Sequence, residues 1–184
     1  MRSLIPLCAA ALLAGTAPLA AQGARPPGPM RQLDWLVGEW RGAGTMTRGP
    51  GQQVEGSIVE RATSHAGGYA MTLSGLGKAA VAGGDSIVVH DAFAMLWHDA
   101  EAGRFRLKTF RANGHTVDAD IEVGERRIVW GFPDPRAGQI RFTVSLTPEG
   151  RWHEVGEFSR DGASWTRFFE MTLSRVENEA QAPH

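Results

Sequence analysis

Two residues of opposite charge, Glu154 and Arg167, fall on the side of two late strands that the alternation of apolar residues turns inward. The small residue Gly156 leaves room opposite Arg167. A charge inside a barrel needs a partner. The two residues therefore predict either a structural ion pair near one rim or an anchor for the polar head of an apolar ligand. A carboxylate head would suit Arg167, because a guanidinium can make bidentate contacts.

A second pair of opposite charges, Asp91 and Arg111, falls on the same side if Trp97 pairs with Phe105. Such a pair near a strand end is typical of a salt bridge at the rim of a barrel. We interpret it as structural rather than as part of a ligand site.

The histidines do not predict a metal site. His90 and His98 lie on one strand and are separated by about 27 Å at ~3.4 Å per residue, so they cannot share an ion. No nucleophile, zinc-protease or phosphate-loop motif occurs, and the glycines of Gly75-Leu76-Gly77 are interpreted as a loop. The sequence therefore predicts no catalytic residue, no metal site and no cofactor.

Short apolar segments separated by turn-forming residues dominate the chain. The predicted strands are Glu39–Thr47, Gln53–Thr63, Tyr69–Gly75, Ser86–Trp97, Arg104–Ala112, Thr116–Val123, Arg126–Phe132, Gln139–Leu146, Trp152–Arg160 and Ser164–Val176. Regular strands with tight turns predict an all-β fold, an antiparallel meander of about ten strands that closes into a barrel.

The turns predict the register. Gly124-Glu125 and Asp161-Gly162 are interpreted as two-residue turns. The loop at 113–115 is predicted to have three residues, because this length pairs Lys108 with Asp120 and keeps the acids out of the interior. The solvated outer wall is then predicted to carry Arg104, Arg106, Lys108, Asp118, Asp120 and Glu122.

The same alternation predicts an apolar interior. Its residues are Phe93, Met95, Trp97, Phe105, Leu107, Ile121, Ile128, Trp130, Ile140, Phe142, Trp152, Trp165, Phe169 and Met171. Eight-stranded barrels are nearly filled by their own side chains, so about ten strands should leave a cavity. A large apolar lumen with few polar groups is the usual form of a small-molecule site. The predicted ligand-binding residues are Arg167, Glu154, Trp97, Phe105, Trp130, Phe142, Trp152, Phe169 and Met171.

The N-terminal and C-terminal segments indicate which class of protein the chain belongs to. Residues 1–21 combine Arg2 with a short apolar run and small residues at its exit, which predicts a secretory signal peptide cleaved near Ala21. The single cysteine, Cys8, leaves with it. We therefore expect a periplasmic or secreted protein with a flexible leader (22–29), one barrel domain (30–176) and a polar tail (177–184). The formal net charge of −1 and the absence of a later apolar span predict neither a nucleic-acid partner nor a membrane span.

The stretch from Leu33 to Gly44 predicts a short apolar helical turn that plugs one end of the barrel and leads into the first strand. Its pattern, with Gly38-x-Trp40 on the strand, resembles the lipocalin and fatty-acid-binding barrels, or calycins. That resemblance implies that an arginine of the last strand, here Arg175, packs over Trp40 and closes the barrel.

The wider pattern Leu33-x-x-Leu36-x-Gly38-x-Trp40-x-Gly42-x-Gly44 is similar to the nitrobindin-type barrels and their lipocalin-like bacterial relatives of uncharacterised function. The segments from Trp152 to Phe158 and from Asp161 to Trp165 share that similarity. Nitrobindin-type barrels bind haem through a histidine of a late strand. The last strand here, Trp165–Leu173, has no histidine, so haem is kept only as an alternative.

These observations favour a barrel that sequesters or carries a small apolar or amphipathic molecule, with no cofactor. Three alternatives stay open: a nitrobindin-like haem protein, an enzyme that uses an interior carboxylate such as Glu154 or Glu157, and a non-catalytic partner-binding domain. The sequence predicts neither the identity of the ligand nor the oligomeric state.

Overall fold

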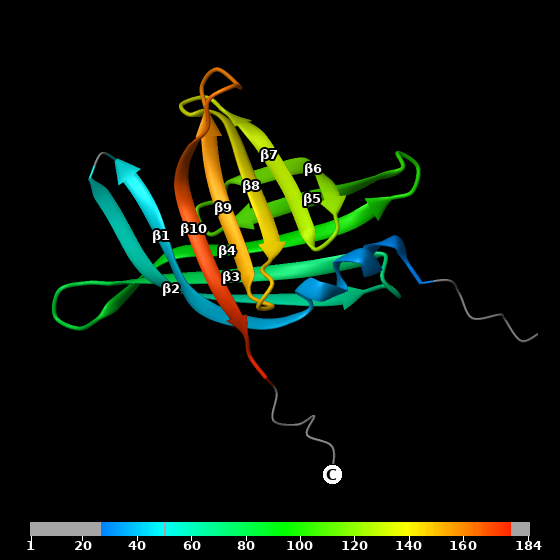
Figure 1. The fold of residues 1–184 in the computed structure, drawn as a ribbon, viewed down its shortest axis with the longest axis horizontal. Coiled ribbons are helices and arrows are strands. Elements are labelled where there is room, and N and C mark those ends of the chain that lie inside the picture. The colour runs from blue at the N-terminus through cyan, green and yellow to red at the C-terminus, as the bar shows by residue number, and fades with distance from the viewer. Residues whose placement is uncertain (1–26, 50, 178–184) are drawn as a thin grey trace, which may run out of the picture.

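The computed structural model describes residues 27–49 and 51–177, which form a closed barrel of ten antiparallel strands (Figure 1). The elements are η1 (Pro29–Leu36), β1 (Gly38–Gly49), β2 (Gln52–His65), β3 (Ala70–Ala80), β4 (Ser86–Asp99), β5 (Arg104–Arg111), β6 (Thr116–Gly124), β7 (Arg127–Asp134), β8 (Gly138–Leu146), β9 (Trp152–Ser159) and β10 (Thr166–Arg175). Neighbours in the chain are neighbours in the barrel, and β1 pairs with β10 to close it. The predicted fold class is confirmed.

The predicted signal peptide (1–21), most of the leader (22–29) and most of the polar tail (177–184) lie outside the described residues. Within the described ranges, no helix has both the length and the apolar character to cross a bilayer.

A 3₁₀ helix, η1, closes one end of the barrel, away from the β1–β2 and β3–β4 turns (Figure 1). Pro29 starts the helix, and the three residues Met30, Leu33 and Leu36 are fully buried. Their spacing of three places them on one face of a helix with three residues per turn. The predicted apolar plug is therefore present.

The closure between the first and last strands has the expected contacts. Trp40 pairs with Arg175 across β1 and β10. The Trp40 indole donates a hydrogen bond of 2.8 Å to the carbonyl of Leu36, which ties η1 to the strand. Gly38 has a φ of 131°, and a Cβ at that position would lie 2.6 Å from an Arg175 guanidinium nitrogen. Glycine is required there both by the backbone conformation and by the space.

The predicted outer wall is confirmed. Asp120 forms ion pairs of 3.0 Å with both Arg104 and Arg106, and Lys108 forms one of 3.1 Å with Asp118. The loop between these strands has three residues, as predicted, but it spans 112–114 rather than 113–115, since the Arg111 amide donates to the carbonyl of His115. The strand partners therefore shift by two positions, which leaves every side chain on its predicted face.

The turn between β6 and β7 is also displaced by one residue. Gly124 pairs with Arg127, so the turn residues are Glu125 and Arg126, the latter with a φ of 48°. Ile121 consequently pairs with Trp130 instead of Ile128. The partners shift by two positions, so the side chains of β6 and β7 again lie on their predicted faces.

The strand predicted over 86–97 is present as β4, but its predicted register against β5 is wrong. Trp97 pairs with Arg106 rather than with Phe105, a difference of one residue. The four-residue loop 100–103 sets this register, because an Asp99 carboxylate oxygen accepts hydrogen bonds from the amides at 101 and 102. A slip of one residue reverses both faces of a strand. The β4 residues Phe93, Met95 and Trp97 therefore lie on the outer wall, where the first two side chains are 43% and 40% exposed.

The last hairpin departs from its prediction as well. The loop between β9 and β10 has six residues, organised by Asp161, whose carboxylate accepts hydrogen bonds from the amides of Ala163 and Ser164 and from the Ser159 hydroxyl. These bonds lower the pKa of Asp161 to about 2. A β-bulge then separates Arg167 from Phe169. Between the loop and this bulge, the side chains of β10 therefore lie on the opposite face from the predicted one.

The third strand is longer than predicted. β3 continues through Gly75, Leu76 and Gly77, which the sequence predicted as a loop. Gly75 pairs with Glu60 of β2, and Gly77 pairs with His90 of β4. The two glycines are part of the barrel wall.

Candidate functional site

The lumen contains a cavity of about 360 Å³. Its lining includes six of the nine predicted ligand-binding residues, namely Trp130, Phe142, Trp152, Glu154, Phe169 and Met171. Additional apolar lining comes from Ile58, Leu96, Leu107, Ile128, Val144 and Phe168. The wall is thus mainly apolar and aromatic, as small-molecule sites usually are.

Aromatic rings order one side of this wall. Trp130 and Phe142 stack with their ring centres 4.6 Å apart, and Phe142 meets Phe168 and Phe169 edge-on at 5.8 and 6.4 Å. Gly156 lies among them, because a Cβ there would come within 2.8 Å of Phe142. The glycine therefore lets the rings pack against the strand.

The floor of the cavity lies at the η1 end. Trp40 and Trp152 are buried there with their rings nearly perpendicular and their centres 5.8 Å apart. Leu96 and Leu173 are also buried and belong to the same apolar cluster as η1. The floor is therefore a packed apolar layer.

Glu154 of β9 lies in the lumen, as predicted. The Trp152 indole nitrogen is its hydrogen-bond donor, at 3.4 Å. Burial raises the pKa of Glu154 to about 7, and the bond from Trp152 offsets this only in part. The carboxyl group is therefore largely protonated in mildly acidic solution.

A second carboxyl group, that of Glu60 on β2, lines the same cavity. Burial, with a smaller contribution from the negative charge of Glu154, raises the pKa of Glu60 to about 8. Its carboxyl lies over Gly75, since a Cβ on that glycine would collide with the Glu60 oxygens. Gly75 thus creates the space that the Glu60 side chain occupies.

The other half of the cavity, toward the β1–β2 turn, is lined by His90 and Arg111. Burial, and next the charge of Arg111, lower the pKa of His90. Arg111 pairs with Ala92 rather than with Asp91, and no Asp91–Arg111 ion pair occurs among the described residues. The predicted rim salt bridge is wrong because the β4 register differs by one residue.

Two predicted cavity residues point elsewhere. Arg167 lies on the outer wall with a side chain that is 57% exposed, and it forms an ion pair of 2.6 Å with Glu170. It cannot pair with Glu154, because the bulge in β10 reverses its face. Trp97 also lies outside, with the Arg106 guanidinium 5.7 Å from its ring centre. The prediction that Arg167 anchors a ligand head inside the barrel is wrong.

Phe105 and Trp165 differ in a similar way. Phe105 packs against the core but does not line the cavity, and its ring meets the imidazole of His98 at 5.0 Å. Trp165 lies outside under the guanidinium of Arg141, at 3.9 Å.

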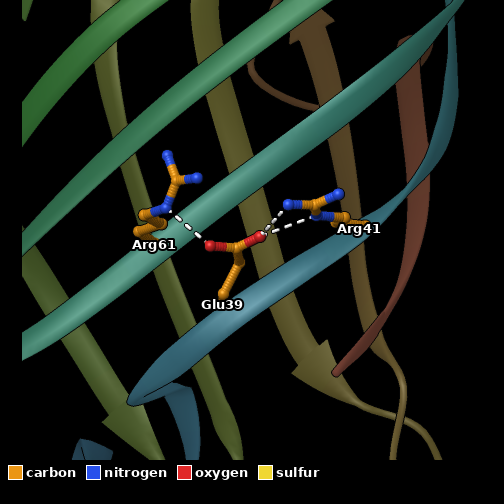
Figure 2. Close-up of polar contacts among 3 residues, drawn as sticks. All are labelled: Glu39, Arg41 and Arg61. Carbon is orange, nitrogen blue, oxygen red and sulfur yellow. Dashed lines mark hydrogen bonds and ion pairs between the residues drawn. The ribbon is translucent and has the colours of Figure 1, made fainter. Parts of the chain in front are cut away.

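Several other charges of the wall are paired outside the lumen. Figure 2 shows Glu39 between Arg41 and Arg61, with nitrogen–oxygen distances of 2.6 and 2.7 Å. The hydrogen bonds from Arg41 and then Arg61 lower the pKa of Glu39. Glu157, which the sequence offered as an interior carboxylate, instead pairs with Arg141 on the outer wall.

Glu60 was missed at the sequence level, although a signal for it exists. Val54, Gly56, Ile58 and Ala62 occupy alternate positions of β2, and Glu60 continues that series. A charged residue inside an apolar alternation predicts an interior charge. The partner Gly75 could not be found, because the sequence ended the predicted third strand at Gly75 and interpreted Gly75-Leu76-Gly77 as a loop.

The residues do not fit the haem site that the nitrobindin-type resemblance implies. β10 has no histidine, and His153 of β9 lies outside the lumen, 2.8 Å from Glu170. The histidine of the lining, His90, belongs to the early strand β4. Among the described residues, no group of three or more metal-ligating side chains is present.

Comparisons with known proteins give a fold and no family. No family model matches the chain, and no curated protein matches its sequence. Among solved structures, the barrel is similar to "Crystal Structure of Rv2717c from M. tuberculosis", with a TM-score of 0.58 and 15% sequence identity. The match covers 82% of this chain and 99% of the other. At this identity the likeness shows a common barrel fold, consistent with the calycin-like architecture.

Proposed function

We propose that the protein binds a small apolar or amphipathic molecule inside its barrel and sequesters or carries it. The observation that carries the proposal is the cavity of about 360 Å³ with its apolar and aromatic lining. Its volume lies within the range of small-molecule pockets. The packed floor formed by Trp40 and Trp152 makes the cavity a site with one closed end.

The binding energy would come from the removal of apolar surface from water, at roughly 25 cal/mol per Å². The stacked rings of Trp130 and Phe142 offer a flat face for such contact. The lining glycines and the ordered rings leave the cavity largely pre-formed, which reduces the entropic cost of binding.

Titration with the neutral dye Nile red tests the proposal. We expect saturable binding with about one dye per chain, a blue-shifted emission, and displacement by octanol. Mass spectrometry of organic extracts from natively purified protein should identify the bound molecule. Failure of both dye and octanol to bind would contradict the proposal.

The localisation is tested separately, with the full chain. We propose that the signal peptide is removed near Ala21 and that the mature protein is exported. N-terminal sequencing of protein from the periplasmic and extracellular fractions should begin within a residue or two of Gln22. Recovery of only the uncleaved chain from the cytoplasm would reject this part of the proposal.

A second candidate function is acid–base chemistry on a bound molecule. The raised pKa values of Glu154 and Glu60, about 7 and 8, are typical of carboxyl groups that accept and return protons near neutral pH. The generic test is the elimination reaction of a nitrobenzisoxazole, in which a carboxylate takes the C–H proton as the N–O bond breaks. We expect a rate that rises with pH through about 7 and is lost in Glu154→Gln. The same rate in both proteins would leave binding as the function.

A further inference from the structure

We propose that the preferred ligand is an organic cation, a protonated amine with an apolar body, whose ammonium group lies between the carboxyl groups of Glu60 and Glu154. This inference rests on the proposed binding function and specifies the class of ligand. The apolar body would lie along the aromatic side of the cavity, against Trp130 and Phe142.

The two carboxyl groups lie in the same half of the barrel. Glu60 pairs with Trp40 across β1 and β2, and Glu154 is two residues from Trp152 on β9. The rings of Trp40 and Trp152 are in contact, so both acids stand just above the same floor. Their mutual influence is seen in the pKa of Glu60, which the charge of Glu154 raises. A ligand group between them would contact both.

Neither group is satisfied by the protein. Within residues 27–49 and 51–177, Glu60 has no hydrogen-bond or ion-pair partner, and Glu154 has the Trp152 indole alone. Both side chains are part-buried and line the cavity, so a bound group can reach their oxygens. An ammonium group supplies three donors and the opposite charge. The unsatisfied oxygens therefore fit a cation better than a second apolar group.

Four arginines of the described ranges are engaged elsewhere. Arg41, Arg61 and Arg167 are paired with acids on the outer wall. The Arg175 guanidinium donates to the carbonyls of Trp35 and Val37 beneath the floor. None of these four arginines is among the groups that shift the pKa of Glu60 or Glu154.

Four basic side chains do line the cavity, namely Arg48, Lys78, His90 and Arg111. They come from the halves of β1, β3, β4 and β5 that lie away from η1. None of them lowers the pKa of Glu60 or Glu154, so none neutralises the carboxyl pair. The cavity is consequently divided into an acidic floor and a basic outer half.

The proposed contact has a pH signature. An ammonium group favours the ionised carboxylates, so amine binding should release protons and strengthen as the pH rises through about 7 and 8. His90 should contribute little in this window, because its pKa is lowered and its ring is already neutral. The other basic groups of the lining are Arg48, Lys78 and Arg111.

Displacement of Nile red by octylamine, octanol and octanoate near pH 8 tests the inference, since the three molecules share one chain and differ in the head group. We expect octylamine to bind at least about tenfold more tightly than the other two. Glu60→Gln and Glu154→Gln should remove this preference, because octylamine should lose far more affinity than octanol does. Glu157→Gln, on the outer face of the same strand as Glu154, is the matched control and should keep the preference.

The outcomes separate the inference from the proposed function. Equal affinity for octylamine and octanol would overturn the proposal that the ligand is a cation. A preference for octylamine that persists when Glu60→Gln and Glu154→Gln are combined would overturn it too. Tighter binding of octanoate would overturn it as well and would assign the head-group site to Arg111. Absence of binding by all three would reject the small-molecule function itself. Should a Gln variant fail to fold, Gly75→Ala offers a second route, because it displaces the Glu60 carboxyl without removing it.

Discussion

The guanidinium of Arg175 lies over the indole of Trp40, with its central carbon 4.1 Å from the ring centre. One of its nitrogens donates a hydrogen bond of 2.7 Å to the carbonyl of Trp35, and another donates to Val37. A residue of the last strand thereby holds both the first strand and η1. The closure of the barrel and the plug at its end depend on the same side chain.

Arg175→Met should therefore lower the stability of the whole barrel. The cation–π contact and two hydrogen bonds together predict a loss of about 2–3 kcal/mol in the free energy of unfolding. Arg175→Lys should recover only part of it, because an ammonium lacks the fork that reaches both carbonyls. Urea unfolding measures the effect, with Arg160→Met as the control at an exposed position. Equal midpoints for the two Met variants would argue against this role.

The interior acids predict how stability depends on pH. The pKa of Glu60 is raised from 4.5 to about 8 in the folded chain, so the folded state binds a proton that the unfolded state loses. The stabilising contribution of Glu60 should be fully present below about pH 4.5 and should be lost as the pH rises toward 8, by up to ~1.4 kcal/mol per pH unit. Glu154 adds a similar term up to about pH 7.

Glu60→Gln should flatten that slope and should be more stable than the natural chain at pH 8. Glu122→Gln, at an exposed position of the outer wall, is the control and should leave the slope as it is. Urea midpoints measured from pH 5 to 9 decide the matter. A wild-type stability that climbs over this range would show that Glu60 is not a buried, raised acid.

Gly75 should matter for binding rather than for folding. Gly75→Ala places a methyl group where the Glu60 carboxyl lies, so octylamine affinity should drop by about tenfold while the flexible carboxyl end absorbs the collision. Gly124→Ala is the matched glycine control, because its new Cβ would meet only ordinary contacts of 3.7 and 3.9 Å. Unchanged octylamine affinity in Gly75→Ala would show that Glu60 does not take part in binding.

The sequence predicted the barrel well because its signals are local. Turn formers and alternating apolar residues recur along the chain, and the apolar stretch that begins at Leu33 predicts the plug. The pairing of Trp40 with Arg175 was predicted as well, although only from a resemblance.

The interior was predicted less well because faces depend on register. The two faces of β4 were predicted the wrong way round, because the register set by the Asp99 loop differs by one residue from the assumed register. Arg167 was placed on the wrong face because the alternation of apolar residues does not reveal the bulge before Phe169. Glu60 was visible in the alternation of its strand. Its proximity to Glu154, more than ninety positions later in the chain, depends on the closure of the barrel.

The central claim is that the lumen is the binding site, and one pair of neighbouring substitutions on β4 tests it most directly. Ala94 packs against the core from the inner face, whereas Met95 points outward and is 40% exposed. Ala94→Phe should fill the cavity and weaken Nile red binding by at least about tenfold, with Met95→Phe binding like the natural chain. Undiminished binding in Ala94→Phe, or a loss in Met95→Phe alone, would contradict the account and place the site on the outer wall.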